Sequence, residues 1–354
     1  MAAASEPDES RVSRAARLLA LSATAIVLLL AAGALAVTFL VKVPQPRVTL
    51  DLPPMPAVLP ARDVVPPPAA APAAAPPPSI PAAFTRPRFA GHALVADPAL
   101  IEASSGLPRI AADGRKPMTA YAASARAGRW RIAIVMSGLG LDATATEAAV
   151  KELPPQVTLA FSPYAADLQD RIDAARAAGH EVVLDLPMEP GDFPDSDPGP
   201  DMLRARPDDP ANRDTLHRVL ARATGYAGVG NVLGGRFLTD RDALSPVLGD
   251  LARRGLYFYD DNTMTVPEAA HTAALSGVPF AGASEALDTI AAATAIDDRL
   301  SALEAEARAH GSAIGAALPY PVSVARIARW AKSLTRRGFV LVPVSAIVAV
   351  PNNS

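Results

Sequence analysis

Two carboxylates stand at the end of an apolar segment, where acid–base chemistry could be placed. The segment 180–190 predicts a short buried strand, 181–186, with Asp185 near its end and Glu189 just beyond it. Pro187 is expected to end the strand, because proline cannot donate to a sheet ladder. Parallel sheets and barrels build their sites where strands give way to loops. We therefore expect the functional site at this strand end.

Three other predicted strands are also followed by polar side chains, from Ser137, Asn231, Arg236 and Asp260. A barrel would bring these residues to one rim with Asp185 and Glu189. Taken singly, each is also explained as a helix cap, a loop hydrogen bond or, for Arg236, a structural salt bridge. Because several converge, we predict a site. We assign catalysis to Asp185, Glu189 and Asp260, and substrate binding to Ser137, Asn231 and Arg236.

The candidates lie where apolar strands alternate with amphipathic helices. The predicted strands are 132–136, 157–162, 181–186, 228–233, 256–259, 278–281, 312–317 and 340–344. The predicted helices include 143–153 with Asp142 as its N-cap, 166–178, 240–254, 285–310 and 323–337. This alternation predicts a parallel sheet covered by helices. It suits either a distorted (β/α) barrel or a doubly wound sheet, and we favour the barrel.

The N-terminal part of the chain has a different composition. Residues 18–41 carry no charge and no proline, which is long enough to span a bilayer, and arginines precede them. The positive-inside rule then predicts a cytoplasmic tail at 1–17, a transmembrane anchor at 18–41, and a periplasmic remainder. A cleaved signal peptide ending near Ala34-Leu35-Ala36 is the alternative, and it also exports the rest of the chain.

A proline-rich linker separates this anchor from the predicted domain. Of the 36 prolines in the chain, 15 lie between Pro44 and Pro87. We therefore assign 42–88 to an extended spacer, 89–130 to a transition segment and 131–348 to the folded domain.

Composition excludes several kinds of function. The net charge of −3 gives no reason to expect nucleic acid as a partner. The absence of cysteine excludes disulfides and thiol catalysis. The five histidines lack the spacing of a ligand pair, so we predict neither a metal nor another cofactor. They are His92, His180, His217, His271 and His310.

Glycines 138 and 140 with Ala143 match the dinucleotide-binding fingerprint between a strand and a helix. That reading also needs an acidic residue about 20 positions later, at the end of the next strand. The next strand, 157–162, ends without one. We therefore interpret Gly138 and Gly140 as a tight turn that lets backbone approach a neighbour closely.

Several of these segments together resemble the divergent polysaccharide deacetylases. The most specific is Leu184-Asp-Leu-Pro-Met-Glu-Pro190, and the others are Pro198-Gly-Pro200, Gly234-Gly-Arg-Phe237, Arg254-Gly-Leu256 with Asp260, and Leu341-Val-Pro343. The resemblance covers about 131–347 and implies a distorted (β/α) barrel related to carbohydrate esterases. It also implies an envelope glycan as partner, and in the family a metal-bound water that attacks an N-acetyl carbonyl.

The chain departs from the family pattern at the metal ligands. Ser137-Gly138 stands where the family has two aspartates, and Asp185 stands where it has a histidine. Val232 and Leu318 replace two further histidines. What the resemblance carries over is Glu189, Asn231, Arg236 and Asp260, without the metal centre.

Three functions remain open on the sequence. The domain is a glycan-binding or regulatory protein, a carbohydrate hydrolase with a rebuilt carboxylate site, or a structural envelope protein with a vestigial cleft. Retained charged groups at the strand ends favour the first two.

Overall fold

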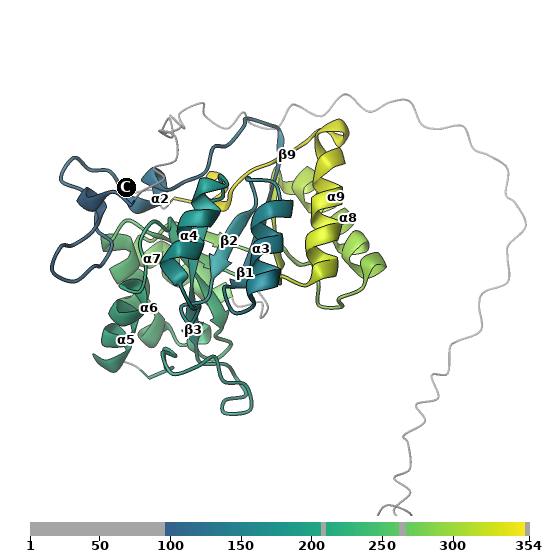
Figure 1. Cartoon of the computed structure of the whole chain (residues 1–354). Helices are drawn as coiled ribbons and strands as arrows, with labels where there is room; N and C mark the ends of the chain where they lie inside the picture. The colour runs from purple at the N-terminus through teal and green to yellow at the C-terminus, as the bar shows by residue number, and fades with distance from the viewer. Residues whose placement is uncertain (1–95, 207–209, 262–266, 351–354) are drawn as a thin grey trace, which may run out of the picture. The chain divides into compact units, whose positions relative to one another are not determined.

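The computed structural model describes residues 96–206, 210–261 and 267–350 (Figure 1). The predicted anchor at 18–41 and the linker at 42–88 lie outside these residues. Within the described ranges, no helix combines the length and apolar character needed to cross a membrane.

The described residues form one sheet of nine strands in which every pairing is parallel. The strands are β1 Trp130–Leu139, β2 Thr158–Phe161, β3 Val182–Met188, β4 Gly228–Leu233, β5 Tyr257–Asp260, β6 Phe280–Gly282, β7 Glu285–Ala286, β8 Ser312–Ala317 and β9 Phe339–Leu341. Their order is β6-β5-β4-β3-β2-β1-β8-β7, and β9 pairs with the start of β1. The predicted strands are therefore present, with shifted ends at several of them.

The two edges of the sheet are joined by a single bent segment. β6 pairs with β5 and β7 pairs with β8, although only Ala283 and Ser284 separate β6 from β7. The Ala283 amide donates to the Asp260 carbonyl and the Ser284 amide donates to the Ile314 carbonyl, at 2.8 and 2.7 Å. The sheet consequently curls into an incomplete barrel whose edge strands β6 and β7 do not pair with each other, which agrees with the predicted distorted barrel rather than a doubly wound sheet.

Helices cover the outside of the curled sheet (Figure 1). They are α3 Ala143–Glu152, α4 Leu168–Ala177, α5 Pro210–Leu220, α6 Arg241–Arg253, α7 Pro267–Ser276, α8 Ala293–His310 and α9 Pro321–Leu334. The predicted cap Asp142 accepts from the Ala145 amide, and Asp240 caps α6 in the same way. Helices α5 and α7 were not predicted, and β7 occupies the start of the expected helix 285–310.

Strand alternation gives the barrel two separate apolar cores. Outward-facing residues such as Ile134, Leu184 and Phe258 pack against the helices. Inward-facing residues such as Val183 and Tyr257 fill the interior. Along each strand, the two cores therefore predict which way a polar residue at the strand end points.

Strand β3 continues through Pro187 to Met188, so the expectation that Pro187 ends it is wrong. β2 pairs with β3 only as far as Leu184, and the later part of β3 has no β2 neighbour. The Pro187 carbonyl accepts from the Leu203 amide, on the side away from β4. The N–H that proline lacks would point to that same side, so its absence costs no hydrogen bond to β4.

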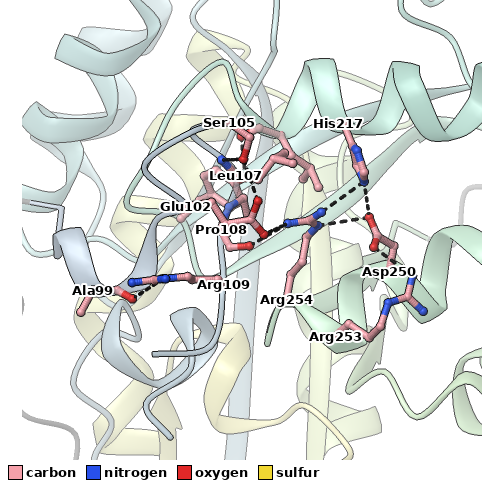
Figure 2. Close-up of polar contacts among 12 residues, drawn as sticks. Ala99, Glu102, Ser105, Leu107, Pro108, Arg109, His217, Asp250, Arg253 and Arg254 are labelled. Atoms are coloured by element: carbon pink, nitrogen blue, oxygen red, sulfur yellow. Dashed lines mark hydrogen bonds and ion pairs between the residues drawn. The ribbon is translucent and has the colours of Figure 1, made fainter. Parts of the chain in front are cut away.

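The segment before β1 closes the N-terminal end of the barrel. Its side chains Leu100, Met118 and Tyr121 belong to the interior core, so part of the expected transition segment is packed. Figure 2 shows Arg254 holding this segment to the helices. The guanidinium donates to Glu102 at 2.9 Å and to the Pro108 carbonyl at 3.1 Å.

The same guanidinium contacts two helical side chains. Arg254 donates to Asp250 of α6 at 3.1 Å and lies 3.2 Å from His217 of α5, which itself contacts Asp250 at 2.7 Å. A single buried cation thus fixes α5 and α6 against the closing segment, and His217 is part of the same polar network.

A fully buried carboxylate, Glu181, organises the interior at this end. It accepts hydrogen bonds from the Ala123 amide, the Thr158 and Tyr257 hydroxyls, and both the amide and hydroxyl of Ser345. Burial raises the pKa of Glu181, and the hydrogen bonds from Ser345 oppose that rise. Because the donors belong to four residues from separate parts of the chain, Glu181 ties the closing segment, β2, β5 and the C-terminal turn together.

We expect Glu181→Gln to lower the free energy of unfolding by about 1–3 kcal/mol. The amide nitrogen of glutamine cannot accept, so it would face at least two of these donors. Denaturant unfolding of the chain measures the change, and exposed Glu147→Gln is the control, expected within about 0.5 kcal/mol of the parent. A Glu181→Gln protein as stable as the parent would show that the network contributes no specific stability.

Candidate functional site

Asp185 points into the barrel from the middle of β3, level with the end of β1. Alternation places it on the inward face with Val183, because Leu184 and Leu186 pack outward against the helices. Its carboxylate accepts a 3.0 Å hydrogen bond from the Gly138 amide of β1. A buried carboxylate requires a polar partner, and the Gly138 amide supplies one. Arg236, the other predicted rim residue that could pair with Asp185, contacts Glu189 instead.

Gly138 reaches Asp185 because β1 is irregular there. The pairing of β1 with β2 shifts between Met136 and Leu139, and Gly138 has a φ of 74°. This left-handed conformation favours glycine and turns the amide away from the regular ladder. Glycine at position 138 therefore allows a β1 amide to donate a hydrogen bond to the Asp185 carboxylate of β3.

Burial controls the protonation of Asp185. Its side chain is 1% exposed, and burial raises the pKa of the carboxyl to about 7. The Gly138 amide opposes the rise, and the negative charge of Asp261 adds to it. A carboxyl that exchanges its proton near neutral pH has the property required of a general acid or base.

Asn231 and the end of β5 form a second contact. The Asn231 side chain donates to Asp261 at 3.1 Å and accepts from the Asp261 amide at 2.9 Å. It also donates to the Leu233 carbonyl at 2.8 Å. Asn231 thus joins the ends of β4 and β5. Asp260 is 3% exposed and lies on the face of β5 opposite to Tyr259.

Glu189 and Arg236 form a third contact. Arg236 donates to Glu189 at 3.1 Å, and the Ala205 amide donates to the other carboxylate oxygen at 2.8 Å. The Glu189 carbonyl also accepts from the amides of Arg236 and Phe237. Glu189 consequently holds two loops together, while the Arg236 side chain remains 61% exposed.

Four of the six candidates, Asp185, Asn231, Glu189 and Arg236, therefore take part in three separate contacts toward the C-terminal ends of the strands. Asp260 is not part of these contacts and faces away from the interior into which Asp185 points. Ser137 is half-buried and is not part of these three contacts. Exposed apolar side chains border this end of the barrel, from Leu141 after β1, Leu233 at the end of β4, and Leu318 and Tyr320 after β8. Such a mixture of apolar rim and few polar groups is typical of a ligand site.

Sequence reasoning missed one residue here, Tyr259. The sequence analysis placed Tyr259 only as the last residue of an apolar strand. In the structure its side chain faces the barrel interior, one position before Asp260. The available signal was the pair Gly228 and Gly230 in the neighbouring strand. Those glycines leave room for the rings of Tyr257 and Tyr259, since a Cβ on either would come within 3.0 Å of a ring.

The donor set does not fit the divalent metal that the fold family implies. In the described ranges, no three His, Cys, Asp or Glu side chains are grouped to hold an ion. Gly138, Val232 and Leu318 stand where family ligands are expected, and none has a side-chain donor atom. Of the described histidines, His180 contacts the Val157 and Val150 carbonyls at the start of β3, away from Asp185.

Comparison with known proteins identifies the family. Residues 134–348 match the divergent polysaccharide deacetylases, so the chain belongs to that family. The uncharacterized protein ATU2773 of Agrobacterium tumefaciens is 42% identical, with a TM-score of 0.66 over 68% of this chain and 99% of that one.

Two curated relatives are more distant. The uncharacterized protein YibQ of Escherichia coli is 26% identical over 198 residues, which is 55% of this chain and 60% of YibQ. An uncharacterized protein of Haemophilus influenzae is 25% identical over 198 residues, which is 55% of this chain and 69% of that protein. The chain thus matches less than two thirds of YibQ.

We expect the stability of the Asp185→Asn variant to depend on pH differently from the parent. The folded pKa of Asp185 lies above its unfolded value, so its stabilising contribution is present below about pH 4 and is lost as pH rises through about 7. Asparagine cannot ionise, and its oxygen can still accept from Gly138. Between pH 4 and 8, the free energy of unfolding of the variant should therefore rise relative to that of the parent. The rise should be about 1.4 kcal/mol for each unit by which the folded pKa of Asp185 exceeds its unfolded pKa.

Denaturant unfolding across this pH range measures the difference. Exposed Asp170→Asn is the control for losing one aspartate charge. Parallel pH curves for the parent and Asp185→Asn would contradict the buried, proton-holding carboxyl.

Proposed function

We propose that this chain binds an envelope glycan, either a polysaccharide or peptidoglycan, at the C-terminal end of its barrel and without a metal ion. The observation that carries the proposal is the Asp185–Gly138 hydrogen bond. A polar, inward-facing group is kept at the strand ends, but it is bonded to backbone where the family pattern has metal ligands. The chain is then a binding or regulatory member of a deacetylase family.

The surroundings of Asp185 support binding. The Asn231–Asp261 and Glu189–Arg236 contacts fix the loops that border it, and fixed loops lower the entropy lost on binding. Tyr320 and Leu318 offer apolar surface beside these polar groups.

A rebuilt hydrolase is the second candidate. The raised pKa of Asp185 favours it, because a general acid must hold its proton near the working pH. In that case Asp185 donates the proton and Glu189 is the candidate second carboxylate, because Asp260 faces the opposite side of β5 from the interior.

We expect Asp185→Asn to keep the fold and to weaken glycan binding about tenfold or more, the scale of one charge-assisted hydrogen bond. Calorimetric titration of the purified chain with peptidoglycan fragments and with chitin and chitosan oligosaccharides measures the affinity. Product analysis of the same mixtures detects hydrolysis, and exposed Asp170→Asn is the matched control.

Chelator should leave the parent affinity unchanged. Deacetylation that chelator abolishes and metal restores would overturn the metal-free proposal. Full affinity in Asp185→Asn would remove Asp185 from the site, and chain cleavage by the parent that Asp185→Asn lacks would favour the hydrolase.

We further propose that residues 18–41 anchor the chain in the cytoplasmic membrane and that the barrel lies in the periplasm. Arg11, Arg14 and Arg17 before an uncharged run support this orientation. An alkaline phosphatase fused after Val350 should be active, and the fusion should sediment with membranes. A soluble mature form that begins at Val37 would show cleavage instead of anchoring.

A further inference from the structure

The hydroxyl of Tyr259 is buried without a hydrogen-bond partner among the described residues. Tyr259 is 1% exposed, and unpaired buried hydroxyls are uncommon because they lose their hydration without compensation. Tyr257, on the same strand and the same face, shows the ordinary arrangement, since it donates to Glu181 at 2.9 Å. The difference indicates that Tyr259 is placed to bind a group from outside the chain.

Sheet register puts Tyr259 level with Asp185. Asp185 pairs with Gly230 in β4, and Gly230 pairs with Tyr259 in β5. Gly230 contributes no side chain between them, and a Cβ there would come 3.0 Å from the Tyr259 ring. The carboxyl and the phenol thus face the same interior layer, two strands apart, with the Tyr259 ring lying close to Gly230 between them.

The charge of this layer favours a cation. Burial raises the pKa of Tyr259 well above its usual range, and the negative charges of Asp261, Asp260 and Asp185 raise it further. Arg236, a cation of the same rim, is paired with Glu189 and is largely exposed. An anionic ligand would be repelled here, whereas a cation with several N–H donors matches the carboxylates and the phenol oxygen.

Resting on the proposed glycan binding, we propose that Tyr259, Asp185 and Asp261 bind the ammonium group of a de-N-acetylated amino sugar. An ammonium has three N–H donors for three acceptors. An acetamido group has one N–H, no charge and an added acyl group. The site therefore selects the deacetylated form of a glycan over the acetylated form. Because Tyr259 is buried, the side chains that cover it must move for the ligand to reach it.

The test compares two probes on the full chain at low salt. Chitosan oligosaccharides carry free amines, and chitin oligosaccharides of the same length carry acetamido groups. The parent should bind chitosan at least about tenfold more tightly, as expected for a charge-assisted contact.

Tyr259→Phe should remove most of this preference while leaving stability unchanged or higher, because it deletes an unpaired polar atom. Tyr257→Phe is the matched control, expected to lose stability but to keep the preference. Should Tyr259→Phe fail to fold, Asp185→Asn must reduce the preference instead.

Equal affinity of the parent for both probes, or an unchanged preference in Tyr259→Phe, would overturn the ammonium site while leaving glycan binding in place. Failure of the parent to bind any glycan would overturn the proposed function as well, so the two failures are distinct.

Discussion

The buried carboxylate of Glu181 is the constraint on which the rest of the barrel depends. Its donors come from the segment before β1, from β2 and β5, and from the turn after β9. A charged or protonated carboxyl in an apolar interior requires such partners, because an unsatisfied one costs several kcal/mol. Satisfying Glu181 therefore determines where the ends of the domain must lie.

Two inward-facing carboxyl groups on one segment of the chain, Glu181 and Asp185, have different surroundings. Glu181, just before β3, and Asp185, in the middle of β3, both face inward with Val183 between them. Five donors surround the carboxylate of Glu181, and a single amide contacts that of Asp185. Tyr257 and Tyr259 repeat this division on β5. Among the described residues, the interior carboxyl and tyrosine hydroxyl thus have more hydrogen-bond partners at the N-terminal end of the barrel than at the C-terminal end, where a ligand would gain more from binding.

The sequence predicted the parallel barrel because apolar runs and helix caps are local signals. It located Gly228–Leu233 and Ser312–Ala317 as they are observed. It could not show that Pro187 stays in β3, since this depends on where the neighbouring β2 ends. Nor could it show the role of Glu181 or Tyr259. Those roles depend on which donors tertiary packing brings to each side chain, and no local pattern contains that information.

The order of the strands has a consequence for how the chain folds. From β1 to β6 each strand pairs with the next one in sequence, so this part of the sheet can form by adding one strand at a time. The exceptions are at β1, which pairs with β8 through Arg131 and Ser312, a separation of 312 − 131 = 181 residues, and with β9 through Trp130 and Phe339. Pairings of such high contact order form late. Until then β1 presents an unpaired apolar edge, so incomplete chains are the form of this protein most exposed to aggregation.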